Sequence, residues 1–204
     1  MIAFSTCWNS NRHTDGLSVI EEIQRIGFDA IEISHGLKVS LLPGIQQAVK
    51  QGKIKVFGLH NFCPSPVEVM IDAPDCYEFT SHRAFERKRS LDLTLTTLEN
   101  AASLGAKYVV VHMGSIPMKR LTPLLEKLQK NGCGATRKYV KTKLALIRKR
   151  KSKANFYLER AAEALSLIAK RASELGVVVG VESRSAYEDL PNEDEMLSLM
   201  EQFS

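Results

Sequence analysis

The sequence predicts an α/β protein with a parallel sheet, either open or part of a (β/α) barrel. The first observation is a fivefold alternation of short apolar runs, rich in β-branched residues, with longer segments of helical periodicity. The second is that three runs end abruptly in a side chain that can bind a metal or move a proton, at His60, His112 and Glu182. Parallel α/β folds carry their chemistry at the carboxyl ends of strands. The three residues therefore indicate one site assembled from distant parts of the chain.

The apolar runs define five strands, each bounded by glycine or polar residues. We expect them at residues 2–7, 29–34, 55–60, 107–112 and 177–182. Because near-continuous apolar runs are typical of strands covered on both faces, we expect both faces of the sheet to be buried. Five such strands leave open edges at the first and the fifth.

Helical segments separate the strands. Asp15 or Thr14 can cap the first helix, whose apolar residues keep helical spacing until Gly27 ends it. Right-handed crossovers through such helices make consecutive strands parallel. The other helices are expected near residues 40–52, 83–104, 121–130, 139–150 and 156–175, and from Pro191 to the C-terminus.

A long polar loop follows the third strand, from Asn61 to about Thr80, and contains Pro64, Pro66 and Pro74. Loops of this length are uncommon inside a compact domain and are often functional. We treat residues 1–204 as a single domain.

The charge is unevenly distributed along the chain. Residues 118–153 contain 13 Lys or Arg against one acid, Glu126, which gives +12, whereas the remainder has 15 basic and 22 acidic residues, which gives −7. We interpret 118–153 as a basic helical insertion between strands four and five. It could bind nucleic acid, but Leu144, Leu146 and Ile147 indicate packing, and aromatic residues for base stacking are missing apart from Tyr139. A solvated insertion that covers the barrel mouth is the preferred interpretation.

Glu182 is the strongest candidate for chemistry, because a carboxylate at the end of a valine run is costly to bury unpaired. A metal, a catalytic role or an ion pair with Arg184 would each explain it. His112 and His60 could bind a metal or a substrate oxygen, or could serve as structural donors. Arg184 could hold an anionic substrate group.

The remaining candidates have alternative structural explanations. Trp8 could stack on a substrate or cap the core. Asn61, Glu32 and His35 could line the same mouth, although local hydrogen bonding is the simpler interpretation for Glu32 and His35. We read two further histidines as ordinary surface residues, His13 and His82.

Several classes of protein are disfavoured. The chain has no apolar stretch of about 18 residues and no signal-peptide pattern, so we expect a cytoplasmic protein without a membrane partner. The motifs of nucleophilic triads and phosphate-binding loops are missing. The four cysteines have no C-x-x-C spacing and are expected to be reduced thiols.

Five motifs carry a resemblance to the xylose isomerase-like TIM-barrel superfamily of sugar phosphate isomerases and epimerases. In chain order they are IAFSTCW, DAIEIS, VFGLHNF, YVVVHMG and GVVVGVESRSAYEDLPNEDEMLSLM. The resemblance covers nearly the whole chain except 118–153. It implies a parallel (β/α) barrel of the TIM type and a divalent metal, Mn, Mg or Zn.

The resemblance also implies roles for the strand-end residues. Glu182 corresponds to a metal ligand that is in many members the proton-transfer base, and His60 and His112 correspond to residues that contact substrate or metal. Assigned in this way, the catalytic residues are Glu182 and His112, the metal ligand is Glu182, and the substrate-binding residues are His60, Trp8 and Arg184. The implied function is a metal-dependent isomerase or epimerase of a sugar or sugar phosphate.

The chain departs from the family pattern because it contains only about five of eight β/α units. We therefore expect a C-terminally truncated protein, or a partial barrel completed by another chain, that is inactive by itself. Two alternatives remain open: a metal-dependent endonuclease acting at apurinic sites, and a barrel-derived binding module without catalysis. The expected partner is a small sugar, nucleic acid is not expected, and a homo-oligomer is compatible with the sequence.

Overall fold

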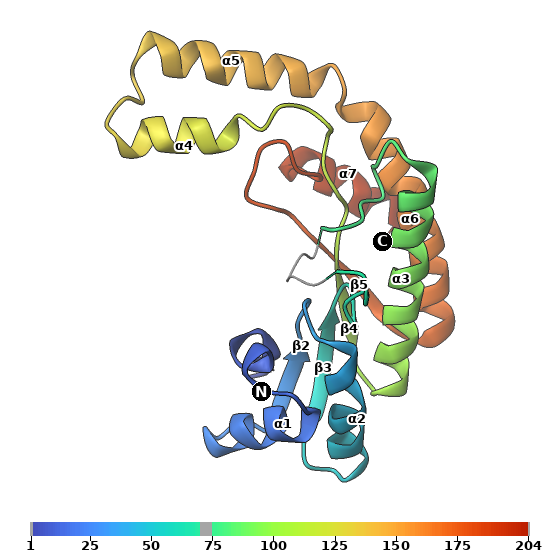
Figure 1. Cartoon of the computed structure of the whole chain (residues 1–204). Coiled ribbons are helices and arrows are strands. Elements are labelled where there is room, and N and C mark those ends of the chain that lie inside the picture. Colours follow the sequence, from blue (N-terminus) through green and yellow to red (C-terminus); the bar gives the residue numbers. More distant parts are fainter. Residues whose placement is uncertain (1, 70–74, 204) are drawn as a thin grey trace.

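Five parallel strands form one sheet in the order in which they occur in the chain (Figure 1). The structure is a computed structural model and describes residues 2–69 and 75–203. The edge strands are β1 and β5, as expected. The five strands are β1 (Phe4–Ser5), β2 (Ala30–Ile33), β3 (Lys55–His60), β4 (Tyr108–His112) and β5 (Val178–Glu182).

Helices connect successive strands, so the α/β fold with a parallel sheet is confirmed. Helices α3 and α6 pack against each other on one side of the sheet, while the opposite side is open (Figure 1). The α-helices are α1 (Gly16–Arg25), α2 (Leu42–Lys50), α3 (Ala84–Ser103), α4 (Thr122–Lys130), α5 (Arg137–Lys151), α6 (Ala154–Leu175) and α7 (Glu193–Phe203).

The first strand is shorter than the expected 2–7. After Ser5 the chain turns into a 3₁₀-helix, Thr6–Trp8, because the Ser5 hydroxyl accepts the backbone N–H of Cys7. The Thr6 hydroxyl then accepts the N–H of Ser34 and so links the N-terminal turn to the chain just after β2. The helix expected at 40–52 is also divided, into a 3₁₀ turn at Val39–Leu41 and α2.

Asp15 caps the N-terminus of α1 and is one of the two residues that the sequence suggested for this role. Its carboxylate accepts the backbone N–H of Ser18 at 3.0 Å, which satisfies a donor at the start of the helix. Gly27, which follows the helix, has φ of 95°, a left-handed conformation that only glycine adopts without strain. The local signals at both ends of α1 are therefore read correctly from the sequence.

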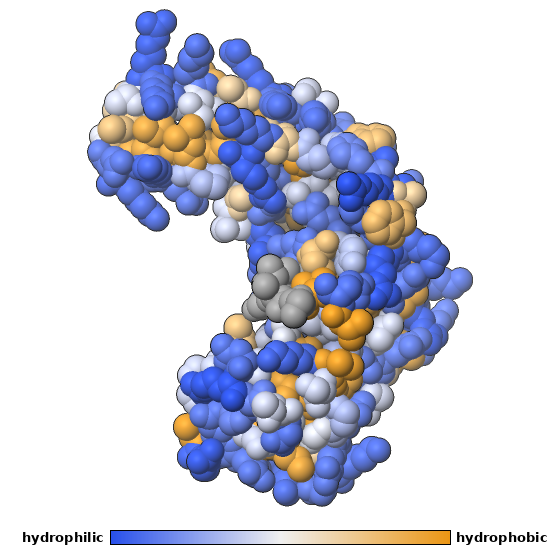
Figure 2. All heavy atoms as spheres, in the orientation of Figure 1, coloured by the Kyte–Doolittle hydropathy of each residue, from blue (hydrophilic) through white to orange (hydrophobic). Residues whose placement is uncertain are grey.

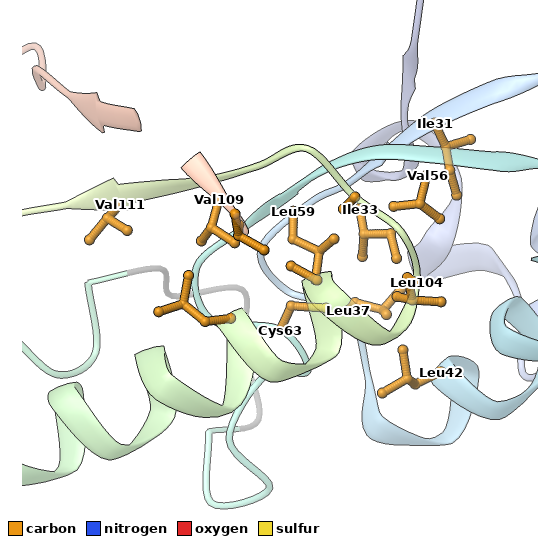
Figure 3. Close-up of a cluster of buried hydrophobic side chains, with 14 of the residues drawn as sticks. Ile31, Ile33, Leu37, Leu42, Val56, Leu59, Cys63, Leu104, Val109 and Val111 are labelled. Atoms are coloured by element: carbon orange, nitrogen blue, oxygen red, sulfur yellow. The ribbon is translucent and has the colours of Figure 1, made fainter. Parts of the chain in front are cut away.

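The hydrophobic core lies between the sheet and its covering helices (Figure 3). Alternate strand residues point to this side, because successive side chains of a strand face opposite ways. The strands contribute Ile31, Ile33, Val56, Leu59, Val109 and Val111, and the helices contribute residues such as Ile20, Ile45, Leu98, Leu165 and Ile168.

The other face of the sheet is only partly covered, so the expectation of two buried faces is not met. The alternating positions on this face include Glu32, His60, Tyr108 and His112, and Val110 between the last two is partly exposed. Val178 at the edge strand is 65% exposed. Polar and ionisable side chains on this face are compatible with solvent, and this is the face that carries the site.

Residues 118–153, which we call the basic arm, form a hairpin of α4 and α5 that projects from the sheet (Figure 1). Its base is held by buried charges. The Arg150 guanidinium, 3% exposed, makes two hydrogen bonds to Glu195 (2.7 and 2.8 Å) and donates to the carbonyl oxygens of Tyr187 and Asp189. The arm is therefore fixed to the loop between β5 and α7.

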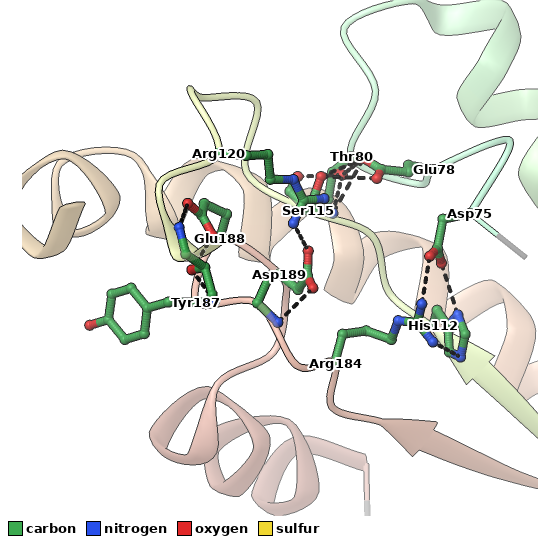
Figure 4. Close-up of polar contacts among 12 residues, drawn as sticks. Asp75, Glu78, Thr80, His112, Ser115, Arg120, Arg184, Tyr187, Glu188 and Asp189 are labelled. Carbon is green, nitrogen blue, oxygen red and sulfur yellow. Dashed lines mark hydrogen bonds and ion pairs between the residues drawn. The ribbon is translucent and has the colours of Figure 1, made fainter. Parts of the chain in front are cut away.

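A second buried acid fixes the start of α4. Glu188 accepts the backbone N–H groups of Leu121 and Thr122 and the Thr122 hydroxyl (Figure 4). Burial raises the pKa of Glu188, but these hydrogen bonds outweigh burial, and the net pKa lies below the ordinary value of 4.5. A carboxylate at a helix N-terminus also interacts favourably with the helix dipole.

We expect the free energy of unfolding to decrease as the pH falls and Glu188 becomes protonated. The folded pKa is lower than the unfolded one, so the unfolded state binds the proton more tightly below about pH 4.5. At pH 7 the replacement Glu188→Gln should cost about 2 kcal/mol, the scale of hydrogen bonds to a charged group. The free energy of unfolding, measured by urea denaturation, should differ less between wild type and Glu188→Gln as the pH falls toward 3. An equal difference at both pH values would contradict this assignment.

Among residues 2–69 and 75–203, no helix has both the length and the apolar character needed to traverse a lipid bilayer.

Candidate active site

The strand register brings the predicted residues together. His112 and Glu182 are paired directly across β4 and β5, and His60 is paired with Val110, two residues before His112. All three side chains leave the sheet on its open face near the carboxyl ends of the strands. The predicted assembly of one site from three successive strand ends matches this geometry.

The facing atoms of these residues are close enough to share one ion. His60 Nε2 lies 2.9 Å from His112 Nε2 and 3.5 Å from Glu182 Oε2, and His112 Nε2 lies 3.8 Å from the same oxygen. Two ligand atoms of a tetrahedral zinc ion with bonds of about 2.0 Å are roughly 3.3 Å apart. The three separations bracket that value, so the donor set fits a divalent metal.

A carboxylate lies on the outer side of each imidazole. His112 Nδ1 lies 2.8 Å from Asp75 Oδ1 and donates its proton there, which directs the Nε2 lone pair into the cluster (Figure 4). His60 Nδ1 lies 3.7 Å from Glu32 Oε1. Two imidazole lone pairs at 2.9 Å repel unless a proton or a metal ion lies between them. Carboxylate–histidine pairs of this kind are typical of metal centres.

The carboxylates beside the histidines are stabilised as anions. The neighbouring His60 imidazole lowers the pKa of Glu32 more than burial raises it. Burial alone would raise the pKa of Asp75, but the hydrogen bond from His112 and the charge of Arg184 lower it overall. Both acids are therefore ionised at neutral pH; Asp75 accepts the His112 N–H, and Glu32 lies as an anion beside His60.

Tyr108 joins β2 to β4 across a glycine. Glu32, Gly58 and Tyr108 occupy one row of the sheet, and a Cβ on Gly58 would lie only 2.3 Å from the Tyr108 ring. The missing side chain lets the ring cross β3, so that its hydroxyl donates to Glu32 Oε2 at 2.7 Å. Burial and this bond raise the pKa of Tyr108 to about 12. Tyr108 thus stays protonated and holds Glu32 in place.

Arg184 lies at the site but does not pair with Glu182. Its guanidinium contacts Asp75 Oδ2 at 3.0 Å and His112 Nε2 at 3.3 Å (Figure 4). A metal bound at His112 Nε2 would replace the second contact, and the Arg184 side chain is about one third exposed.

The other predicted residues are distributed more widely. His35 stacks edge-on against His60 with ring centroids 5.1 Å apart, and so lies at the site. Trp8 is 44% exposed, and its ring contacts Phe4 and lies under the Arg12 guanidinium. Asn61 is buried and donates to Thr94 on α3, away from the cluster.

The two histidines interpreted as ordinary surface residues differ from each other. His82 is exposed, as expected, although its ring also contacts the Tyr157 hydroxyl. His13 is partly exposed and lies 2.6 Å from Glu22, with which it forms an ion pair at the surface. The His13 hydrogen bond is the chief reason that the pKa of Glu22 is lowered to about 2.

Asp75 and Tyr108 were not identified from the sequence. Asp75 lies in the long loop after β3, where no periodicity marks it, and residues 70–74 of that loop are outside the described part of the chain. Tyr108 begins an apolar run and has the composition of a core residue. The only usable signal was the length of the loop, which already indicated a functional segment.

We expect Asp75→Ala to weaken metal binding about 10- to 100-fold, the usual effect of removing a carboxylate behind a ligating histidine. Asp75→Asn should have a smaller effect, because its amide oxygen can still accept from His112 Nδ1. Isothermal titration with zinc measures both. The control is Asp92→Asn, an exposed carboxylate on α3 that pairs with Lys88. Unchanged affinity in Asp75→Ala would remove Asp75 from the site.

The sequence profile of the xylose isomerase-like TIM barrel matches residues 20–204. The chain belongs to this family. The five parallel β/α units are consistent with a partial barrel of that type.

Solved structures with this fold include sugar epimerases. A D-tagatose 3-epimerase-like protein has 18% identity and a TM-score of 0.58, covering 97% of this chain and 60% of its own. A D-allulose 3-epimerase from Methylomonas sp. in complex with D-allulose has 12% identity and a TM-score of 0.59, covering 98% and 58%. A Thermus thermophilus protein soaked with zinc chloride has 22% identity and a TM-score of 0.54, covering 98% and 60%.

The chain therefore spans about 60% of the length of these structures. At these identities the likeness shows the fold alone. No functionally curated sequence matches the chain.

Proposed function

We propose that this chain carries the metal-binding part of a sugar isomerase or epimerase, acting on a sugar or sugar phosphate by proton transfer next to a carbonyl. The observation that carries the proposal is the convergence of His60 Nε2, His112 Nε2 and Glu182 Oε2 on the open face of the sheet. Family membership and the sugar epimerases of the same fold support the substrate class.

The proposed ligands are the two imidazoles and the Glu182 carboxylate. Mixed nitrogen and oxygen donors suit zinc and manganese, and a carboxylate also suits magnesium. When bound, a divalent cation would act as a Lewis acid that stabilises negative charge on a substrate oxygen.

The protein residues would supply the proton transfer and the positioning. Glu182 directs Oε2 toward the histidines, and its side chain is 43% exposed. The carboxylate is therefore accessible to a substrate on the open face of the sheet. It is therefore the proposed base for the carbon-bound proton. Arg184 is the proposed substrate contact, since its guanidinium reaches the same face. His60, which the sequence suggested as a substrate contact, is proposed as a metal ligand because its Nε2 faces His112 and Glu182.

Trp8 remains a predicted stacking residue. It follows β1, on the same sheet end as the histidines, and its exposed ring could cover one side of a sugar.

The test is metal-dependent stabilisation of the purified chain. Zn²⁺, Mn²⁺ or Mg²⁺ at about 100 times its Kd should add roughly 2.7 kcal/mol. For a protein of this size that raises the Tm by about 5 to 10 °C. If none of the three ions raises the Tm, the metal-site proposal fails and the non-catalytic binding module is favoured.

A further inference from the structure

The cations of the basic arm fall into two groups. Arg120, Arg150 and Lys153 at its base pair with Asp189, Glu195 and the Pro117 carbonyl. The side chains of the other ten are exposed and make no hydrogen bond or ion pair with any residue in the described part of the chain. These ten are Lys119, Lys127, Lys130, Arg137, Lys138, Lys141, Lys143, Arg148, Lys149 and Lys151.

The arm thus presents an uncompensated charge on a fixed support. With Glu126 as its single acid, the ten exposed cations leave a net charge of +9. Like charges this close destabilise the folded arm unless an anionic partner neutralises them. The three cations at the base, by contrast, each have a partner.

An apolar stripe runs between these cations. Leu124 on α4 and Val140 and Leu144 on α5 are 36%, 48% and 46% exposed. Figure 2 shows the stripe as an orange band along the arm with blue residues on both sides. Val140 and Leu144 are four residues apart and share one helix face. The partner must therefore be both anionic and apolar.

The composition of the arm distinguishes among anionic partners. Eight of the ten cations are lysines, which are depleted in protein interfaces, and the arm's only aromatic residue is Tyr139. Nucleic acid would use the cations but would leave the aliphatic stripe unexplained. Lysines that flank leucine and valine on a helix fit a bilayer surface, where the aliphatic groups enter the acyl boundary and the ammonium groups reach the headgroups.

We propose that the basic arm binds the surface of a membrane rich in anionic phospholipid. This goes beyond the proposed function and does not depend on it. It revises the expectation of no membrane partner, which rested on the lack of a spanning segment and not on the surface of the arm. The contact is peripheral: the arm lies on the bilayer while the sheet stays in water.

The test is sedimentation of the full chain with vesicles of phosphatidylcholine alone or with about 30 mol% phosphatidylglycerol. We expect binding only to the anionic vesicles at about 0.1 M salt, and loss of most of it near 0.5 M. The triple variant Lys138→Glu, Lys141→Glu, Lys149→Glu should lower the partition coefficient at least about tenfold. Leu124→Ser, Val140→Ser, Leu144→Ser should lower it several-fold.

Matched controls lie on the body of the protein. Lys50→Glu, Lys53→Glu, Lys107→Glu reverses three exposed lysines outside the arm, and Ile26→Ser, Val39→Ser, Leu167→Ser removes three equally exposed apolar groups. Neither should change vesicle binding. Circular dichroism of every variant checks that the helices remain folded.

Two results would overturn the proposal. One is no sedimentation with anionic vesicles at low salt. The other is tight binding of a short DNA duplex that depends on the lysines and not on the apolar stripe, without vesicle binding; the arm would then be a nucleic-acid contact.

Discussion

Replacing Glu182 by Gln is expected to reduce metal affinity by more than about 100-fold, beyond the 10- to 100-fold typical of residues behind the ligands. The amide keeps the size of the side chain but removes the negative charge that His60 and His112 face at 3.5 and 3.8 Å. Because the side chain is only half-buried, the fold should be retained. Isothermal titration with Zn²⁺ and Mn²⁺ measures the affinity.

The matched control is Glu193→Gln, an exposed acid in the first turn of α7. It should bind metal as wild type does. Glu182→Asp keeps the negative charge on a side chain one methylene shorter. Its metal affinity should lie between those of wild type and Glu182→Gln. If Glu182→Gln bound metal with wild-type affinity, the carboxylate would not be a metal ligand. The proposal that Glu182 is the base beside the metal would then fail.

Replacing Arg150 by Met should destabilise the chain by about 3 kcal/mol, because it leaves a buried partner uncompensated. Glu195, with a side chain 12% exposed, would lose both of its hydrogen bonds to the guanidinium. Two carbonyl oxygens, those of Tyr187 and Asp189, would lose their donor. Urea unfolding measures the loss, and hydrogen exchange in α5 shows whether the arm detaches first.

Arg148→Met is the control, since Arg148 lies two residues away on the same helix and is exposed. It should change stability by less than about 0.5 kcal/mol. The double variant Arg150→Met, Glu195→Met should recover part of the loss, because removing both partners leaves no buried charge. Equal effects of Arg150→Met and Arg148→Met would show that the buried pair does not anchor the arm.

The strands and helices were predictable because their signals are local. Strand β3 has the bounds that the sequence indicated, and the other strand ends differ by a few residues. The apolar runs stop where a polar side chain must reach the open face, as at His112 and Glu182. Periodicity could not show that one face stays open, because valine runs have the same composition whether one face or both are covered.

The candidate site was predictable only in part. Residues at strand ends are marked by their position in the chain, which is why His60, His112 and Glu182 could be placed together. Asp75 comes to His112 through a loop without periodic signal, and Tyr108 reaches Glu32 only because Gly58 lacks a side chain. Such contacts depend on tertiary geometry, which no local pattern encodes.

The most direct test of the metal site is a crystal structure of the chain soaked with zinc or manganese, measured at the metal absorption edge. The proposal requires an anomalous peak within about 2.0 to 2.3 Å of His60 Nε2, His112 Nε2 and Glu182 Oε2. A peak elsewhere, or none at these three residues at saturating metal, would contradict it.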